Sequence, residues 1–269
     1  MAGLPVVACA ESVTALEDVA GKVLVAGSHG GIIAAYYGAK AGAHALILND
    51  AGIGRDEAGV AGLAWLDAIG MAAAAVSHVS ARIGDGADML ARGILSRVNE
   101  RAGRAGLLAG MSCRAAAERL RSACAAHAPP PAYAEGRKIL VTGNREAWGL
   151  DSVGMLTADD AGRVLVIGSH GALHGGRPES ALAVAACAAV FNDAGVGMDG
   201  IGITRLPVLD ARGIPAATVD CASARIGDAQ SMWDSGVLSH VNAAAGQAGA
   251  SRGDSVRSFV SRFCTAKPG

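Results

Sequence analysis

Short apolar runs that end in glycine-rich polar turns recur along this chain. The run at 23–26 breaks into Gly-Ser-His-Gly, and the run at 164–167 does the same. An apolar run bounded by glycine predicts a buried strand that delivers its polar neighbours to a turn. In the first half we predict strands at 5–9, 22–26, 45–48 and 73–76, and helices at 32–43, 58–69 and 85–102. Alternating strands and helices indicate a parallel sheet with helices on its faces.

The second half of the chain repeats the first. Residues 66–106 align without gaps on residues 209–249, with 23 identities in 41 positions, and the motif Asn-Asp-Ala-Gly occurs at both 49–52 and 192–195. Three prolines at 129–131 cannot continue a helix and mark the join. We therefore predict an α/β fold of two tandem homologous units, 1–128 and 129–269, related by a pseudo-two-fold. Each unit is a small parallel sheet of three to four strands with flanking helices, and the second begins with a strand at 138–142.

Polar motifs follow the three main strands of each copy. In the first copy they are Ser28-His29, Asn49-Asp50 and the run from Ser80 to Asp85. Because ligands bind at the carboxyl ends of parallel strands, these motifs predict a site at one edge of the sheet. We expect either one composite cleft to which both copies contribute or two related pockets. Ser96 and Asn99 are expected inside the last helix, where packing explains them.

The candidate catalytic residues are histidines and carboxylates at the strand ends. A histidine titrates near neutral pH, so His29 and His170 are candidate general acids or bases, with Asp50 and Asp193 to orient them or carry a second proton. The alternative for each histidine is a hydrogen bond that ties its own loop together. The alternative for each aspartate is a local turn or a helix cap.

The candidate binding residues are an arginine and the glycines and hydroxyls around it. Arg82 and Arg225 lie in the repeated run Ser-Ala-Arg-Ile-Gly-Asp and offer a bidentate fork for a carboxylate, unless each forms a structural pair with an aspartate at the boundary between the copies. The glycine turns offer backbone N–H groups to an anion. The remaining candidates are Ser80, Ser223, Gly30, Gly31, Gly171, Asn49 and Asn192.

A nucleophile is not singled out by the sequence. Ser28 and Ser169 each precede a histidine, but neighbours on a turn often point apart, and no Gly-x-Ser-x-Gly elbow is present. Cys221 aligns with His78, and we interpret it as a core thiol, with a reactive thiolate as the alternative. The second copy alone carries His174, Arg177 and Glu179, in a turn that is two residues longer than the equivalent turn of the first copy.

Two of these turns together resemble part of a known family. Ser-His-Gly after one strand and Asn-Asp-Ala-Gly after the next are similar to the caspase-type arrangement, in which a strand-end histidine is followed by a strand-end cysteine. Asp50 and Asp193 stand where that thiol would be. The resemblance is confined to the two turns and does not imply cysteine protease chemistry here.

Composition narrows the classes of function. Acidic and basic residues nearly balance, 24 against 23, and no basic stripe predicts nucleic acid binding. No leader or membrane span is predicted, so we expect a cytoplasmic protein. The six cysteines lack metal-site spacing, and we expect reduced thiols, no metal and no cofactor. A hydrophobic content of 51% favours a homo-oligomer.

Three functions remain open on these grounds. The first is a metal-independent hydrolase or lyase for a small anionic, carboxylate-bearing substrate, acting at an amide or cyclic-amide C–N bond. The second is a protein that binds or senses a small anion without catalysis. The third is a nucleotide-dependent enzyme, since a glycine turn is followed by an acidic residue at the end of the next strand.

Overall fold

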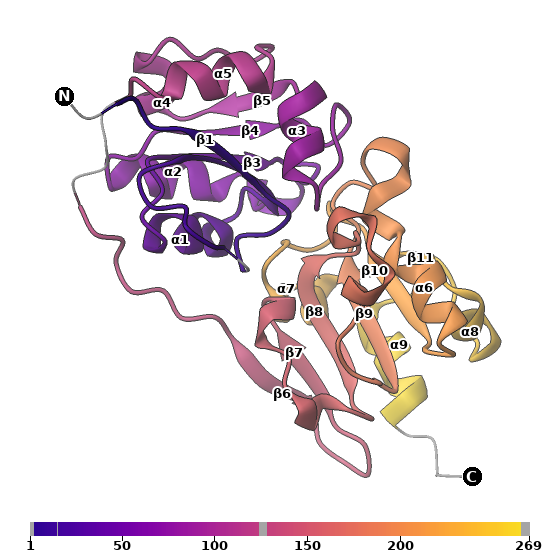
Figure 1. Ribbon diagram of the computed structural model, residues 1–269. Coiled ribbons are helices and arrows are strands. Elements are labelled where there is room, and N and C mark those ends of the chain that lie inside the picture. The colour runs from indigo at the N-terminus through magenta and orange to yellow at the C-terminus, as the bar shows by residue number, and fades with distance from the viewer. Residues whose placement is uncertain (1–2, 15, 124–127, 265–269) are drawn as a thin grey trace. The chain divides into compact units, whose positions relative to one another are not determined.

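The chain folds into two units, each built around its own sheet. The computed structural model describes residues 3–14, 16–123 and 128–264, so Cys124 lies outside the described residues. Unit 1 comprises Met1–Ile53, Glu57–Tyr133 and the short segment Gly197–Asp199. Unit 2 comprises Gly54–Asp56, Ala134–Val196 and Gly200–Gly269. Figure 1 shows mostly parallel strands flanked by helices in both, which confirms the α/β prediction.

Unit 1 contains a five-stranded sheet in the order β1-β2-β3-β4-β5, with four parallel strands and an antiparallel β5. Its strands are β1 (Val7–Ala10), β2 (Val23–His29), β3 (Ala45–Asn49), β4 (Ala73–Val76) and β5 (Leu95–Val98). Its helices are α1 (Ile32–Lys40), α2 (Ala61–Ala68), α3 (Gly86–Arg92), α4 (Glu100–Arg104) and α5 (Cys113–Leu120). The apolar runs therefore predict the central strands well, although β2 continues through the serine and histidine.

Side chains of the central strands of unit 1 alternate between two hydrophobic cores. Leu24 and Leu46 point to one core with residues of α1 and α2, whereas Val23 and Ile47 point to the other with residues of α3, α4 and α5. This alternation is the two-residue period of a strand whose two faces are both covered. Many of the packed residues are alanines, so the helices can approach the sheet closely.

Unit 2 contains a six-stranded sheet in the order β11-β10-β9-β8-β7-β6, whose four central strands are parallel and whose two edge strands are antiparallel. Its strands are β6 (Arg137–Val141), β7 (Ala147–Leu150), β8 (Val164–His170), β9 (Ala188–Asn192), β10 (Ala216–Val219) and β11 (Leu238–Val241). Its helices are α6 (Arg205–Ala211), α7 (Ala229–Ser235), α8 (Ala243–Gln247) and α9 (Val256–Cys264). The antiparallel edge strands make both sheets wider than the three to four strands that we predicted.

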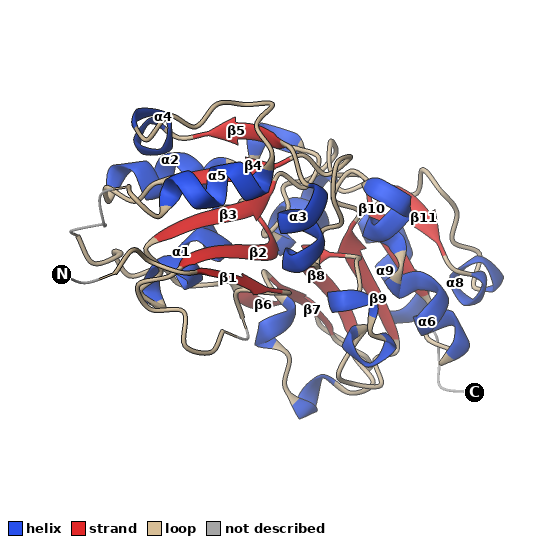
Figure 2. Cartoon of the chain, turned by 45° about the horizontal axis from the view of Figure 1, so that its top comes forward, coloured by secondary structure: helices blue, strands red, loops and turns tan. Residues whose placement is uncertain are grey.

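One helix of unit 1 has no counterpart among the described residues of unit 2. Where α1 follows β2, the chain after β8 instead forms two short 3-10 turns, His174–Gly176 and Pro178–Ser180, before β9 (Figure 2). Leu173, Ala181 and Leu182 of this segment are buried in the core on that face of the sheet. This segment, residues 172–182, is called the β8–β9 loop below.

The predicted long helix at 85–102 is wrong. Residues 85–102 instead form α3, then strand β5, then the start of α4. Asp85 caps α3 by accepting a hydrogen bond from the Asp88 N–H at 2.9 Å. The helix ends at Gly93, where a Cβ would lie 2.5 Å from the Met89 carbonyl oxygen and 2.7 Å from Val76 Cγ1. Ser96 therefore lies in β5 and Asn99 is the N-cap of α4, so neither is inside a long helix.

Candidate functional site

The polar motifs of unit 1 lie on adjacent strands at the carboxyl edge of its sheet. His29 at the end of β2 is paired in register with Asn49 at the end of β3, and Asn49 is paired with Val76 at the end of β4. Because neighbouring strands lie about 4.8 Å apart, these three strand ends span about 10 Å. This is the edge at which parallel α/β sheets bind ligands.

Asp50 forms a close pair with His78, two residues beyond β4. The Asp50 Oδ1 atom lies 2.8 Å from His78 Nδ1 and also accepts the His78 backbone N–H at 2.9 Å. The carboxylate is 2% exposed and the histidine side chain 24% exposed. Burial by itself raises the pKa of Asp50, but hydrogen bonds from His78 and Ser96 and the charge of His78 outweigh it and lower that pKa.

This geometry sets the chemistry that His78 can perform. With the ionised Asp50 accepting from Nδ1, the neutral ring carries its proton on Nδ1 and leaves the Nε2 lone pair free to accept another. A buried carboxylate behind a half-buried imidazole also stabilises the imidazolium that forms after proton transfer. The pair is therefore built as an oriented proton acceptor and donor.

His29 has a different environment. Its ring is buried, its Nδ1 accepts the backbone N–H of Gly31 at 3.1 Å, and burial lowers its pKa to about 4. The ring is therefore neutral at pH 7 with its proton on Nε2, which makes it a hydrogen-bond donor. Asp50 thus orients His78, whereas the His29 bond to its own loop matches the alternative weighed from the sequence.

His170 ends β8 in the same register, paired with Asn192 at the end of β9. Its ring is 4% exposed and packs edge-on against the ring of His174, with 5.6 Å between the ring centroids. His174 lies in the β8–β9 loop that only the second copy carries. The surroundings of this histidine therefore differ between the two copies.

The serines that precede these histidines accept hydrogen bonds from backbone N–H groups. Ser28 Oγ accepts the Val13 N–H at 3.0 Å, and Ser169 Oγ accepts the Val153 N–H at 2.9 Å. Ser28 Oγ also donates to Ser12 Oγ at 3.5 Å. In both units the hydroxyl thus ties the loop after the preceding strand to the strand that carries the histidine.

The turn after each Asn-Asp motif is left-handed. Ala51, Gly52, Ile53 and Gly54 all have positive φ values, from 49° to 76°, and residues 194–197 repeat the pattern. Each non-glycine residue in this conformation costs about 1–2 kcal/mol. The cost is offset in part because Asn49 Oδ1 accepts the Ala51 N–H and Asp50 Oδ1 accepts the Gly52 N–H, bonds that Asn192 and Asp193 repeat. Asn49 and Asn192 therefore shape the turn that presents each aspartate.

The candidate binding arginines have carboxylate partners. In unit 1, Arg82 donates to Asp199 from Nη2 at 2.7 Å and from Nε at 3.1 Å. In unit 2, Arg225 donates to Asp228 from Nε and Nη2 and to Asp56 from Nη1 at 2.9 Å. Both arginine side chains are more than two-fifths exposed, so each charge is already balanced in a hydrated setting.

The serines and glycines named with these arginines serve the turns. Ser80 donates to the Ser77 carbonyl and accepts the Ile94 N–H, and Ser223 repeats this with Asp220 and Val237. A Cβ at Gly30 would lie 2.7 Å from the Gly59 carbonyl oxygen, at Gly31 2.7 Å from His29 Nδ1, and at Gly171 2.4 Å from the Gly202 carbonyl oxygen. These glycines thus permit close contact with the protein's own atoms.

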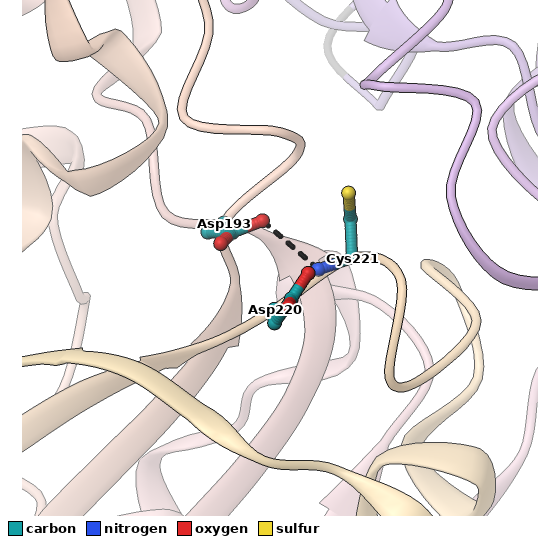
Figure 3. A group of neighbouring side chains, drawn as sticks. All are labelled: Asp193, Asp220 and Cys221. Atoms are coloured by element: carbon teal, nitrogen blue, oxygen red, sulfur yellow. Dashed lines mark hydrogen bonds between the residues drawn. The ribbon is translucent and has the colours of Figure 1, made fainter. Parts of the chain in front are cut away.

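Unit 2 carries a different set of groups at the position of the Asp50–His78 pair. Asp193 accepts the backbone N–H groups of Gly195 at 2.9 Å and of Cys221 at 3.0 Å, and Cys221 replaces the histidine (Figure 3). Burial, together with the nearby Asp193 and Asp220 carboxylates, raises the pKa of the Cys221 thiol to about 12. The thiol is therefore protonated at neutral pH and is a poor nucleophile.

In the described part of the chain, the group of side chains that could hold a metal ion consists of Asp193, Asp220 and Cys221. One ligand atom from each of Asp193, Asp220 and Cys221 lies within 4.8 Å of the others. Two carboxylates and a thiol suit a borderline cation such as Zn²⁺, which would deprotonate the thiol. Asp220 is exposed, whereas Asp193 and Cys221 are buried.

We predict that the two strand-end aspartates affect stability in opposite directions. Burial and then the Asp220 charge raise the pKa of Asp193 despite hydrogen bonds that lower it, so its stabilising contribution is present below pH 3.8 and is lost as pH rises through the raised pKa. Asp193→Asn keeps the Oδ1 acceptor and removes the charge, and we expect it to increase the free energy of unfolding at pH 7. The gain should vanish below pH 3.8.

The matched variant Asp50→Asn should do the reverse. Because the pKa of Asp50 is lowered, its contribution is present above pH 3.8 and is lost as pH falls through the lowered pKa. We expect Asp50→Asn to decrease the free energy of unfolding at pH 7, measured by urea titration of the full chain. Equal signs for the two variants at pH 7 would contradict this account.

Sequence reasoning missed two residues of the unit 1 site. His78 was noted only as the residue aligned with Cys221, and Ser96 was assigned to helix packing, yet hydrogen bonds from both lower the pKa of Asp50. The signal for His78 is its position two residues beyond a strand that borders β3. The signal for Ser96 is its recurrence as Ser239, whose hydrogen bond acts on Asp193 in the same way.

Comparisons with models of protein families, with curated proteins and with solved structures give no match to this chain. Among the described residues, no helix is both long enough and apolar enough to cross a membrane. Function must therefore be inferred from the geometry and chemistry of the site.

Proposed function

We propose that this protein is an enzyme, a hydrolase or lyase, in which the Asp50–His78 pair transfers protons to and from a small anionic substrate. The observation that carries the proposal is the 2.8 Å contact between a buried carboxylate and the Nδ1 atom of a half-buried histidine. It lies at the strand edge where α/β enzymes bind substrates. The proposed reaction breaks an amide or cyclic-amide C–N bond.

The other strand-end groups have supporting roles in this proposal. His78 Nε2 accepts a proton from the attacking water or from the substrate carbon and returns it to the leaving nitrogen. His29, neutral with its proton on Nε2, donates a hydrogen bond to a developing oxyanion, a type of interaction worth about 3–4 kcal/mol in other enzymes. Arg82 attracts the carboxylate of the substrate while remaining paired with Asp199.

Unit 2 has no proton-transfer role in this proposal. Its equivalent pair is Asp193 and Cys221, and the protonated thiol cannot replace an imidazole as a base at neutral pH. The proposed reaction needs neither a metal nor a cofactor. The free cysteines of the described residues favour the cytoplasm, and the hydrophobic composition favours a homo-oligomer, both as further parts of the proposal.

A pooled substrate screen tests the proposal. The full chain is incubated with carboxylate-bearing amides and cyclic amides, and products are followed by mass spectrometry, with the chain carrying His78→Gln in parallel. We expect at least one compound to be consumed by the native chain and not by the variant. Binding without consumption would favour the anion-binding alternative, and dependence on NAD(P), ATP or a flavin would favour the nucleotide-dependent one; either result would overturn the proposal.

A further inference from the structure

Arg205, the first residue of α6, is a buried cation without a carboxylate partner among the described residues. Its side chain has no exposed surface, and its guanidinium carbon lies 5.0 Å from the centre of the Phe191 ring. Nε donates to the Ala172 carbonyl at 3.1 Å, and Nη1 donates to the carbonyls of Ser180, at 2.7 Å, and Ala181. Within the described part of the chain, the buried Nη2 atom has no hydrogen-bond partner.

The need to fill space does not explain why a charged side chain is buried at position 205. The equivalent residue of unit 1 is Gly62, where a Cβ would lie 2.7 Å from the Cβ of Ala35 in α1. Since unit 2 lacks that helix, Arg205 extends into the β8–β9 loop and binds its carbonyls. An apolar side chain would fill the same space without the penalty of burying a charge. Burial lowers the pKa of Arg205 only to about 10, so it stays charged at neutral pH.

A second basic group lies in the same loop. Burial first, and then the charges of Arg205 and Arg177, lower the pKa of His174 to about 4. The charged or titratable groups that act on this ring are Arg205 on α6, Arg177 on its own loop and His170 on β8. Arg177 is itself paired with Glu179, with 3.6 Å between Nε and Oε1, so Arg205 is the main source of the positive field at His174, and such a field attracts an anion.

We propose that unit 2 binds a small anion, through its carboxylate or phosphate group, at Arg205 Nη2 with the His174 ring as the second contact. The anion supplies the charge partner that the guanidinium lacks and accepts the two N–H groups of Nη2. The β8–β9 loop is exposed at Gly175 and Gly176, which both have positive φ values, so we expect the anion to enter from the side of this loop. The site does not depend on the reaction proposed for unit 1.

Calorimetric titration of the full chain tests the site. The probes are inorganic phosphate and malonate, each at constant ionic strength with chloride as the reference anion, so that the tighter probe identifies a phosphate or a carboxylate ligand. We expect binding of at least one probe and a loss of affinity of at least tenfold in Arg205→Met. The matched control is Arg212→Met, which should keep the affinity. Arg212 also holds the end of the loop, through the carbonyl of Leu182 and that of Val184 just beyond it.

The titration of His174 gives a second readout that needs no arginine variant. A bound anion stabilises the imidazolium, so the pKa of His174, followed by NMR and assigned with His174→Gln, should rise from about 4 when the anion is added. By linkage, affinity should increase as pH falls toward that pKa. Failure of both probes to bind, an equal loss of affinity in both arginine variants, or an unchanged His174 pKa at saturating anion would each overturn the proposal.

Discussion

Replacing His78 by Ala is expected to lower kcat/KM by about 10²–10⁴-fold in the reaction that the substrate screen identifies. The imidazole is the group that holds and releases the proton, and Asp50 keeps its Nδ1 protonated so that Nε2 can act. Asp50→Asn should cause a similar loss, because an amide can fix the wrong tautomer and cannot stabilise the imidazolium. The measurement is steady-state kinetics on the purified full chain.

Position 221 supplies the control for this prediction. Cys221→Ala changes the residue that aligns with His78 but removes a thiol that is protonated at neutral pH, so turnover should stay at the level of the native chain. Folding of each variant is followed by circular dichroism. If His78→Ala folds and keeps full activity, or if Cys221→Ala loses as much as His78→Ala, the assignment of the proton carrier to unit 1 is incorrect.

The central strands were predictable because a strand that is buried on both faces of a sheet must be apolar along its length, and each of these strands is an apolar run. The predicted strand at 73–76 has the bounds of β4, whereas β2 and β8 each continue through the glycine, serine and histidine that follow the apolar run. The residues from 85 to 102 were not predictable in the same way. A four-residue strand between two short helices leaves too few positions for periodicity to separate it from one long helix.

The partners of the site residues were harder to predict than their location. The sequence indicates that Asp50 and a histidine share one edge, but choosing His78 over His29 requires the path of the turn after β4 and the direction of each ring. The buried charge of Arg205 depends on a helix that one copy lacks, which an alignment of the similar segments does not cover. The partners of the side chains could therefore be identified only from the structure, whereas the position of the motifs at the strand ends could be predicted from the sequence.

Replacing Asn99 is expected to destabilise unit 1 far more than the loss of an ordinary helix cap. The Asn99 side chain is buried, and its Oδ1 accepts the N–H groups of Ala73 and Ala102 while Nδ2 donates to the carbonyls of Leu63 and Met71, at 2.9–3.2 Å. One amide thus uses its full hydrogen-bonding capacity to join the segments around α2, β4 and α4. Asn99→Ala leaves buried backbone groups unsatisfied and should cost about 3–5 kcal/mol in the free energy of unfolding.

The test separates this network from helix capping alone. Ser112 is the exposed N-cap of α5 and accepts the Ala115 N–H, so Ser112→Ala should cost about 1 kcal/mol in the same urea titration. Asn99→Asp is the sharper variant, because it keeps the Oδ1 acceptor but turns a carboxylate oxygen toward the carbonyls of Leu63 and Met71. It should destabilise unit 1 at pH 7 at least as much as Asn99→Ala. If Asn99→Asp is no worse than Ser112→Ala, the two Nδ2 hydrogen bonds contribute nothing, and Asn99 acts only as a helix cap.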